Sequence, residues 1–217
     1  MTTSERTLEY YFSFISLWSY IGSRALREVV ERRALTLVYK PVDLMAVFAA
    51  TGGLPVKQRA PARQAYRLVE MQRWRDLRHI PLVLRPRYYP ADPARGHRML
   101  LAALRAGREV CRFVDAALQA VWADEQNVED VDVLVRLADA SGLDGSALLT
   151  ASEDPTLRVE EERLTNEAIE RKVFGAPFFF WRGEPFWGQD RLDLLEAAIA
   201  AGRAPIAYRD PESPADT

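Results

Sequence analysis

The stretch between residues 168 and 192 constrains the fold of this chain more than any other part of the sequence. It contains a Gly-Ala-Pro turn at 175–177, two short apolar runs at 178–181 and 185–187, and a new helix that opens at Gln189. Short aromatic runs separated by a Gly-containing turn are typical of a β-hairpin. The segment therefore predicts two antiparallel strands followed directly by a helix, an arrangement that gathers backbone donors and acceptors at one point.

The N-terminal region predicts a second group of strands. Residues 8–14 are rich in aromatic side chains and favour a buried strand, whereas residues 18–33 carry apolar or small side chains at helical spacing. We expect this helix to begin near Ser16 or Trp18, because Ser is a favoured N-cap. Residues 35–39 alternate and predict another strand, which a right-handed crossover would place parallel to the first.

Helical patterns dominate the middle of the chain. A loop at residues 51–55 and a proline-broken connection at residues 81–93 separate these helical patterns. The expected helices cover residues 61–80, 98–106, 109–123, 131–140, 146–151, 155–173 and 191–201. In the last of them, Leu192, Leu195 and Ile199 should face inward.

The resulting order is β-α-β, a run of helices, then β-β-α. It predicts an α/β fold in which residues 1–42 and 166–205 form one core and residues 43–165 form an all-helical insertion. Residues 206–217 are polar and Pro-rich, and we expect them to be disordered.

Composition excludes several classes of function. With 217 residues and 48% hydrophobic residues, the chain can bury a core that folds alone. A net charge of −2 gives no global field that would favour nucleic acid or an acidic membrane. The single cysteine, Cys111, rules out an internal disulfide and a CxxC redox pair, and it favours the cytoplasm. No metal site is expected, because the two histidines, His79 and His97, lack neighbouring ligand-type residues, and solvated or capping roles suit them better.

Three local features could carry chemistry. Ser16 at a helix start could donate a hydrogen bond to a thiolate brought by a ligand, although the local sequence alone favours a simple N-cap. The bond before Pro177 is equally compatible with a cis form, which would leave the backbone groups of Ala176 free to bind an extended peptide, and with an ordinary trans form. Gln189 and Asp190 could hold an α-amino group and an α-carboxylate, or Asp190 could only cap its helix.

The combination of motifs resembles a known family. The chain is similar to 2-hydroxychromene-2-carboxylate isomerases and, more widely, to kappa-class glutathione transferases within the DsbA-like thioredoxin family. The similarity extends from about residue 7 to residue 202. It is carried by residues 14–20, 40–44, 51–53, 72–74, 168–177 and 186–192.

The resemblance implies a thioredoxin-like core and a glutathione site. Ser16 would face the sulfur of glutathione, and the backbone of Ala176, before a cis-Pro177, would pair with its cysteinyl part. Gln189 and Asp190 match the residues that bind its γ-glutamyl end.

Further expectations concern the edges of this site. Arg63 stands where family members often have a lysine that reaches a ligand carboxylate. Trp18, Tyr88 and Trp187 could line an apolar pocket for an aromatic substrate, although packing in the core is the more ordinary role for each of them.

The chain also departs from the family pattern. Leu17 replaces the proline that usually follows the active serine, Ser13 stands where an Asp is often found, and Gly53 stands where an Asn that touches glutathione is common. These differences leave the fold prediction intact but leave the substrate open.

The resemblance favours a glutathione-dependent isomerase acting on a small aromatic 2-oxo acid, with a homodimer possible by analogy. A kappa-type transferase or peroxidase would use the same site on another electrophile, and a non-catalytic thiol-peptide binding module is the third alternative. A disulfide oxidoreductase is disfavoured, because Ser16 and Ser19 stand where redox cysteines would be needed.

Overall fold

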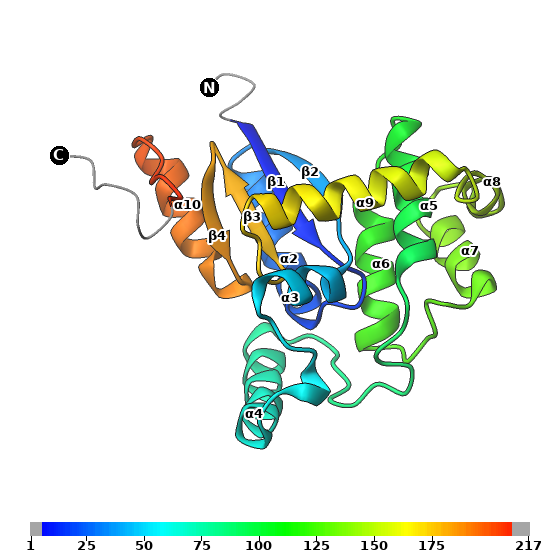
Figure 1. Ribbon diagram of the computed structural model, residues 1–217, viewed down its shortest axis with the longest axis horizontal. Coiled ribbons are helices and arrows are strands. Elements are labelled where there is room, and N and C mark those ends of the chain that lie inside the picture. The colour runs from blue at the N-terminus through cyan, green and yellow to red at the C-terminus, as the bar shows by residue number, and fades with distance from the viewer. Residues whose placement is uncertain (1–5, 210–217) are drawn as a thin grey trace.

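The computed structural model describes residues 6–209, and in this part of the chain it shows one mixed four-stranded sheet surrounded by helices (Figure 1). The strands, in the spatial order β2-β1-β3-β4, are Thr36–Pro41, Thr7–Phe12, Phe178–Trp181 and Glu184–Trp187. β1 runs parallel to β2 and antiparallel to β3, and β3 and β4 form the hairpin. The predicted thioredoxin-like order, β-α-β followed by β-β-α, is confirmed.

Helices occupy most of the remaining described residues. Their bounds are α2 Leu17–Arg32, α3 Leu44–Thr51, α4 Pro61–Arg78, α5 Ala94–Arg105, α6 Cys111–Trp122, α7 Val131–Ala140, α8 Gly145–Ala151, α9 Pro155–Glu170 and α10 Leu192–Ala201, with short 3-10 turns η1 at Val56–Gln58 and η2 at Gln189–Arg191.

One helix, α3, was not predicted. Its eight residues are almost all apolar, so the sequence lacks the polar face that reveals a surface helix. The side chain of Asp43 fixes its start by accepting hydrogen bonds from the backbone N–H groups of Met45 and Ala46, at 2.7 and 3.2 Å.

The sheet separates two cores because successive side chains of a strand point to opposite faces. On one face, Tyr10 and Phe12 of β1 pack with buried residues of α2 and α10. On the other, Tyr11 packs with α3 and α9, which cross in front of the strands in Figure 1. The first core continues into α5, α6 and α7, so the sheet and the helical insertion share one hydrophobic interior. In α10, Leu192, Leu195 and Ile199 are buried as predicted.

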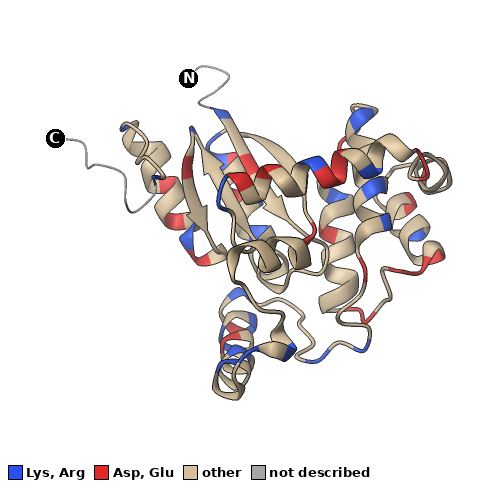
Figure 2. Cartoon of the chain, viewed as in Figure 1, with Lys and Arg blue, Asp and Glu red and all other residues tan. Residues whose placement is uncertain are grey.

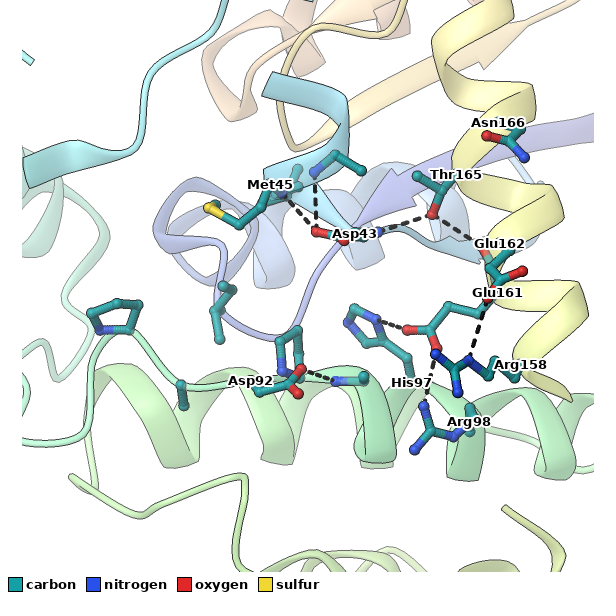
Figure 3. A pocket seen from close by; sticks show the side chains of 17 residues that line it. Asp43, Met45, Asp92, His97, Arg98, Arg158, Glu161, Glu162, Thr165 and Asn166 are labelled. Carbon is teal, nitrogen blue, oxygen red and sulfur yellow. Dashed lines mark hydrogen bonds and ion pairs between the residues drawn. The ribbon is translucent and has the colours of Figure 1, made fainter. Parts of the chain in front are cut away.

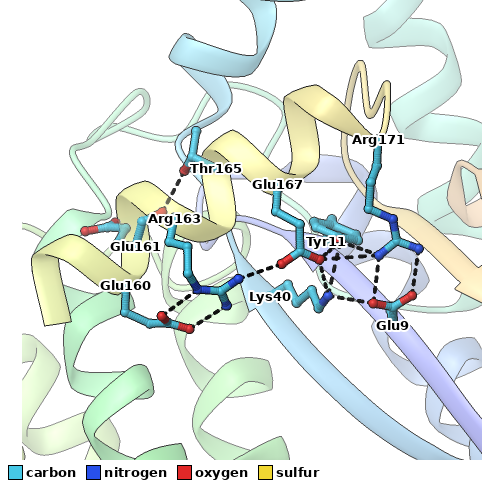
Figure 4. A network of polar contacts seen from close by, with 9 residues as sticks. All are labelled: Glu9, Tyr11, Lys40, Glu160, Glu161, Arg163, Thr165, Glu167 and Arg171. Atoms are coloured by element: carbon cyan, nitrogen blue, oxygen red, sulfur yellow. Dashed lines mark hydrogen bonds and ion pairs between the residues drawn. The ribbon is translucent and has the colours of Figure 1, made fainter. Parts of the chain in front are cut away.

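A polar network crosses the α9 face of the sheet (Figure 4). The ammonium group of Lys40 on β2 donates to the carboxylates of Glu9, at 2.5 Å, and of Glu167. Arg171 holds both carboxylate oxygens of Glu9, at 2.7 and 2.8 Å, and its guanidinium donates to the Tyr11 hydroxyl at 2.7 Å. Opposite charges therefore alternate around a partly buried centre, so removal of one partner would leave a neighbouring charge uncompensated.

The helix α9 joins the two parts of the fold. It begins among the insertion helices and ends against the sheet, and the boundary expected at residue 165 falls within it. At the C-terminal end, residues 206–209 form neither helix nor strand, and residues 210–217 of the expected disordered tail lie outside the described residues. No helix within residues 6–209 has both the length and the apolar character needed to span a bilayer.

Candidate functional site

Ser16 is the N-cap residue of α2 and lies between the end of β1 and the first turn of the helix. Its hydroxyl oxygen accepts a hydrogen bond from the backbone N–H of Ser19 at 3.2 Å, which is the N-cap role predicted from the sequence. The N–H groups of Leu17 and Trp18 lack a hydrogen-bond partner among the described residues. The first turn of α2 therefore presents free donors and a partial positive charge beside the Ser16 hydroxyl.

The Gly-Ala-Pro turn lies against this helix start. The Ser16 hydroxyl donates to the carbonyl oxygen of Ala176 at 3.2 Å, across 160 positions of sequence. The Ala176–Pro177 bond is cis. The carbonyl of Pro177 accepts from the N–H of Gly188 at 2.9 Å, and this bond ties the turn to the segment that leads into α10. Residues from both ends of the chain thus meet at one place, as the sequence predicted.

Gln189 is buried next to this turn and against α2. A Cβ added to Gly22 of α2 would lie 2.6 Å from the Cβ of Gln189, so glycine at position 22 permits the close approach. The Gln189 side-chain oxygen accepts from the Arg78 guanidinium at 2.6 Å. Arg78 also stacks on the Trp74 ring, 5.1 Å from its centroid, and burial lowers the pKa of its guanidinium while nearby acidic groups oppose the shift.

A pocket of about 340 Å³ opens beside these residues. Three charged side chains line it, the cation Arg78 and the carboxylates Asp190 and Asp193, together with Gln189 and apolar parts of α4. A pocket that holds a fixed cation and carboxylates suits a zwitterionic amino-acid head group, because each ligand charge finds its opposite.

The expectation that Asp190 caps its helix was wrong. α10 starts at Leu192 without a side-chain cap, and Asp190 lies within the 3-10 turn η2, where its carboxylate pairs with Arg191 at 2.5 Å. A side chain at Gly188 would collide with the Asp190 carboxylate, 2.5 Å from the added Cβ, so the glycine permits this tight turn.

The remaining predicted site residues are more scattered. Trp187 is 51% exposed and packs on Phe174, while its indole nitrogen lies 2.9 Å from where a Cβ of Gly175 would be, so it borders the turn. Trp18 is half-buried and packs against the main core. Tyr88 is exposed under the Arg87 guanidinium.

Arg63 lies exposed in the first turn of α4, and no hydrogen bond or ion pair joins its side chain to another residue within 6–209. The structure thus gathers Ser16, Ala176 and Pro177 around one point, with Gln189 beside them. It shows no such contact for Arg63 or Tyr88.

The departure at Gly53 has a steric basis. A Cβ at this position would lie 2.5 Å from the ring of Phe48, so the larger Asn side chain of the family cannot be accommodated here without moving Phe48. Leu17, in place of proline, is buried and contributes to the main core.

A second, larger pocket of about 880 Å³ lies between α3, α5 and α9 (Figure 3). Ile15, the residue before Ser16, lines it together with Leu44 and the Pro90–Ala91 segment. Polar groups from α5 and α9, among them His97 and Glu161, form its other wall.

His97 corrects a prediction, because it is neither solvated nor a cap but completely buried. The N–H of Phe14 donates to its Nε2 at 3.3 Å, and the Ser13 hydroxyl lies at the same distance. Its Nδ1 lies 3.0 Å from Glu161 Oε1, and Arg98 holds the other oxygen of that carboxylate at 3.4 Å. Because Nε2 accepts from the Phe14 N–H, Nδ1 is the ring nitrogen that donates to Glu161.

Ser13, His97 and Glu161 thus follow one another as the serine, histidine and acid of a hydrolase triad do. Their geometry, however, does not activate the Ser13 hydroxyl as a nucleophile. The Phe14 N–H occupies the Nε2 lone pair that would have to accept the serine proton, and Ser13 itself is completely buried. The three side chains instead hold residues 13–14, the segment that leads into Ser16.

Arg78, His97 and Glu161 were not identified from the sequence as site residues. His97 and Glu161 are separated by 64 positions and Arg78 and Gln189 by 111, so no local spacing signals either contact. Arg78 lies four residues after the 72–74 motif, which was the one available hint.

Comparison with known proteins agrees with this geometry. The DSBA-like thioredoxin domain model matches residues 7–200. A 2-hydroxychromene-2-carboxylate isomerase of Pseudomonas putida is 34% identical over 199 residues, which cover 88% of this chain and 93% of that protein.

Solved structures give the same relationship. The solved structure of a 2-hydroxychromene-2-carboxylate isomerase superposes on this chain with a TM-score of 0.77 and 30% sequence identity. The match covers 90% of this chain and 95% of the other. The cytosolic disulfide reductase DsbM of Pseudomonas aeruginosa, solved with GSH, shares the fold with a TM-score of 0.67 at 20% identity, covering 90% and 98%. The chain therefore belongs to the DSBA-like thioredoxin family, together with the 2-hydroxychromene-2-carboxylate isomerases.

Proposed function

We propose that this protein is a glutathione-dependent isomerase that interconverts the cis and trans forms of an aromatic 2-oxo acid, as in 2-hydroxychromene-2-carboxylate and trans-o-hydroxybenzylidenepyruvate. The observation that carries the proposal is the hydrogen bond between the Ser16 hydroxyl and the Ala176 carbonyl. It brings a helix start, a Gly-Ala-Pro turn and the Gln189 segment into one site in a chain whose relatives carry this activity.

The residues present fit glutathione. The 340 Å³ pocket offers Arg78 to an α-carboxylate and Asp190 to an α-amino group, which are the charges at the γ-glutamyl end. The backbone N–H of Ala176 forms no hydrogen bond within the described residues, so it can pair with the cysteinyl part of an extended peptide. The first turn of α2, which contacts Ala176 through Ser16, would then hold the sulfur of such a peptide.

When bound, glutathione would supply a thiolate that adds reversibly to the conjugated double bond of the substrate, so that the bond becomes single, rotates and forms again on elimination. The protein's contribution is to keep that sulfur ionised. The free N–H groups of Leu17 and Trp18 and the dipole of α2 stabilise a negative charge. The Ser16 hydroxyl adds a charge-assisted hydrogen bond, for which it must turn away from Ala176.

The test compares two helix caps. Ser16→Ala removes the cap of α2 at the proposed site, and Asp130→Ala removes the cap of α7, where the Asp130 carboxylate accepts from the N–H of Asp132 at 2.9 Å. Both variants should lose about 1 kcal/mol of stability. In a spectrophotometric isomerisation assay with saturating glutathione, Ser16→Ala should fall roughly tenfold or more, whereas Asp130→Ala should retain the wild-type rate. Equal rates in all three proteins would rule out the role of Ser16.

A kappa-type glutathione transferase or peroxidase is the second candidate. The missing Asn at Gly53, explained by the Phe48 ring, changes the glutathione contacts and favours considering another electrophile. Turnover of a generic aryl halide or hydroperoxide, without isomerisation of the chromene, would select this function.

A further inference from the structure

Three arginines lie in and just before the first turns of α4. Arg59, Arg63 and Arg67 follow one another at intervals of four residues, in the segment whose basic residues are blue around α4 in Figure 2. Within residues 6–209, none of the three forms an ion pair with an Asp or Glu. Arg171, by contrast, is a partly buried arginine that is paired with Glu9.

Arg67 is the unusual member of the cluster, because its charge is partly buried. Its guanidinium lies over the rings of Tyr89 and Trp122, 5.8 and 5.4 Å from their centroids. Among the described residues, its one hydrogen bond is a weak one to the sulfur of Met71 at 3.2 Å. Burial lowers the pKa of the Arg67 guanidinium; the Tyr89 hydroxyl opposes this shift and the Arg59 charge adds to it. A half-buried cation without an anion is costly, so an external anion would be bound there with favourable energy.

The surroundings supply a second guanidinium and apolar surface, and no carboxylate of residues 6–209 pairs with the cluster. The indole nitrogen of Trp122 is buried and has no hydrogen-bond partner in the part of the chain that the structure describes. The Arg59 guanidinium lies 6.0 Å from the centre of the Phe48 ring, and burial lowers its pKa too, with the charge of Arg63 adding to the effect. Leu54, whose carbonyl accepts from Arg59 at 2.8 Å, is 46% exposed and offers apolar contact beside the charges.

One segment of the chain connects the cluster with the larger pocket. Tyr89, whose ring faces Arg67, is followed directly by Pro90 and Ala91, and these two residues line the larger pocket together with Ile15, the neighbour of Ser16.

We propose that Arg67, supported by Arg59, is the subsite that binds the carboxylate of an aromatic 2-oxo acid. A guanidinium matches a carboxylate through two parallel hydrogen bonds, and flat aromatic and aliphatic neighbours suit an aromatic ring. The identity of the ligand rests on the proposed function, whereas the existence of an anion site at Arg67 does not.

The test measures binding without turnover. Benzoylformate is a stable aromatic 2-oxo acid without the double bond that isomerises, and benzoylformamide is its neutral counterpart. Calorimetry with the full chain, in the absence of glutathione, should show the acid binding at least tenfold more tightly than the amide, and more tightly than the non-aromatic acid pyruvate. Equal affinity for the acid and the amide, or for benzoylformate and pyruvate, would overturn the proposal.

Variants identify the residue. Arg67→Met should weaken benzoylformate binding roughly tenfold or more and leave binding of the amide unchanged. Arg136→Met, which removes an exposed arginine on α7, should bind benzoylformate as the wild type does. The urea midpoint of Arg67→Met should be no lower than that of the wild type, because a buried unpaired charge is removed.

Arg67→Lys retains the charge and provides a second variant if the methionine substitution prevents folding. It should bind benzoylformate several-fold more weakly, because the paired donors of the guanidinium are lost. Benzoylformate affinity within twofold of the wild type in Arg67→Met, or in Arg67→Lys, would overturn the proposal. So would a loss of glutathione affinity in Arg67→Met with benzoylformate binding intact. A chain that binds benzoylformate through Arg67 but shows no isomerisation would refute the proposed function alone.

Discussion

Replacing His97 by leucine should destabilise the protein severely, although the two side chains have similar volumes. The N–H of Phe14 would lose its acceptor in a completely buried position, which costs about 1–3 kcal/mol. Glu161 would lose its hydrogen bond from Nδ1 and keep only the 3.4 Å contact with Arg98, and loss of a charge-assisted bond costs about 1.5–3 kcal/mol. Together these effects should lower the free energy of unfolding by about 3–5 kcal/mol.

Urea unfolding followed by circular dichroism measures this change. His97→Gln should lose less stability, since its amide can reach the position of Nε2 and accept from Phe14. The control is Met99→Leu, a volume-conserving exchange at a neighbouring position that is also completely buried, which should cost less than about 1.5 kcal/mol. An unfolding free energy of His97→Leu no lower than that of Met99→Leu would refute the reasoning.

Three further predictions concern the pocket and the polar network. Gly22→Ala should weaken glutathione binding several-fold in calorimetry, because the new Cβ would lie 2.6 Å from the Cβ of Gln189 and must displace it; unchanged affinity would contradict this role of Gln189. Arg78→Met should also weaken glutathione binding roughly tenfold or more, because the pocket loses its cation. Affinity for thiols that lack a γ-glutamyl group should not change, and an equal loss of affinity for glutathione and for these thiols would contradict the role of Arg78. Burial raises the pKa of Glu167, but the hydrogen bonds from Lys40 and Tyr11 outweigh it and lower that pKa from 4.5 to about 2. The resulting stability, on the order of 2 kcal/mol after allowing for solvent exposure, is therefore present above about pH 4.5 and is lost as the pH falls towards 2; Glu167→Gln should lack this component of acid unfolding.

The sequence allowed the β-α-β and β-β-α segments to be predicted, because their strands, turns and helix starts carry local signals. The aromatic runs around the turn at 182–183 predict the hairpin, and Ser16 before an amphipathic stretch predicts the start of α2. The helix α3 could not be recognised, since an apolar run without a polar face has no helical period to detect.

Long-range polar contacts were beyond prediction for a different reason. A lone histidine carries no information about a partner 64 positions away, and its burial depends on how α5 packs against α9. A cap was one of the two roles expected for Asp190, because Asp is common at helix starts, but Gly188 allows a tighter 3-10 turn that precedes α10.

The central claim is that a sulfur borrowed from glutathione performs the reaction at Ser16. It is tested most directly by comparing the isomerisation rate with glutathione, with S-methylglutathione and with neither. The account predicts turnover only with glutathione, and competitive inhibition by S-methylglutathione, which keeps the γ-glutamyl group but has no free thiol. A rate that is the same without any thiol, or that is sustained by S-methylglutathione, would contradict it.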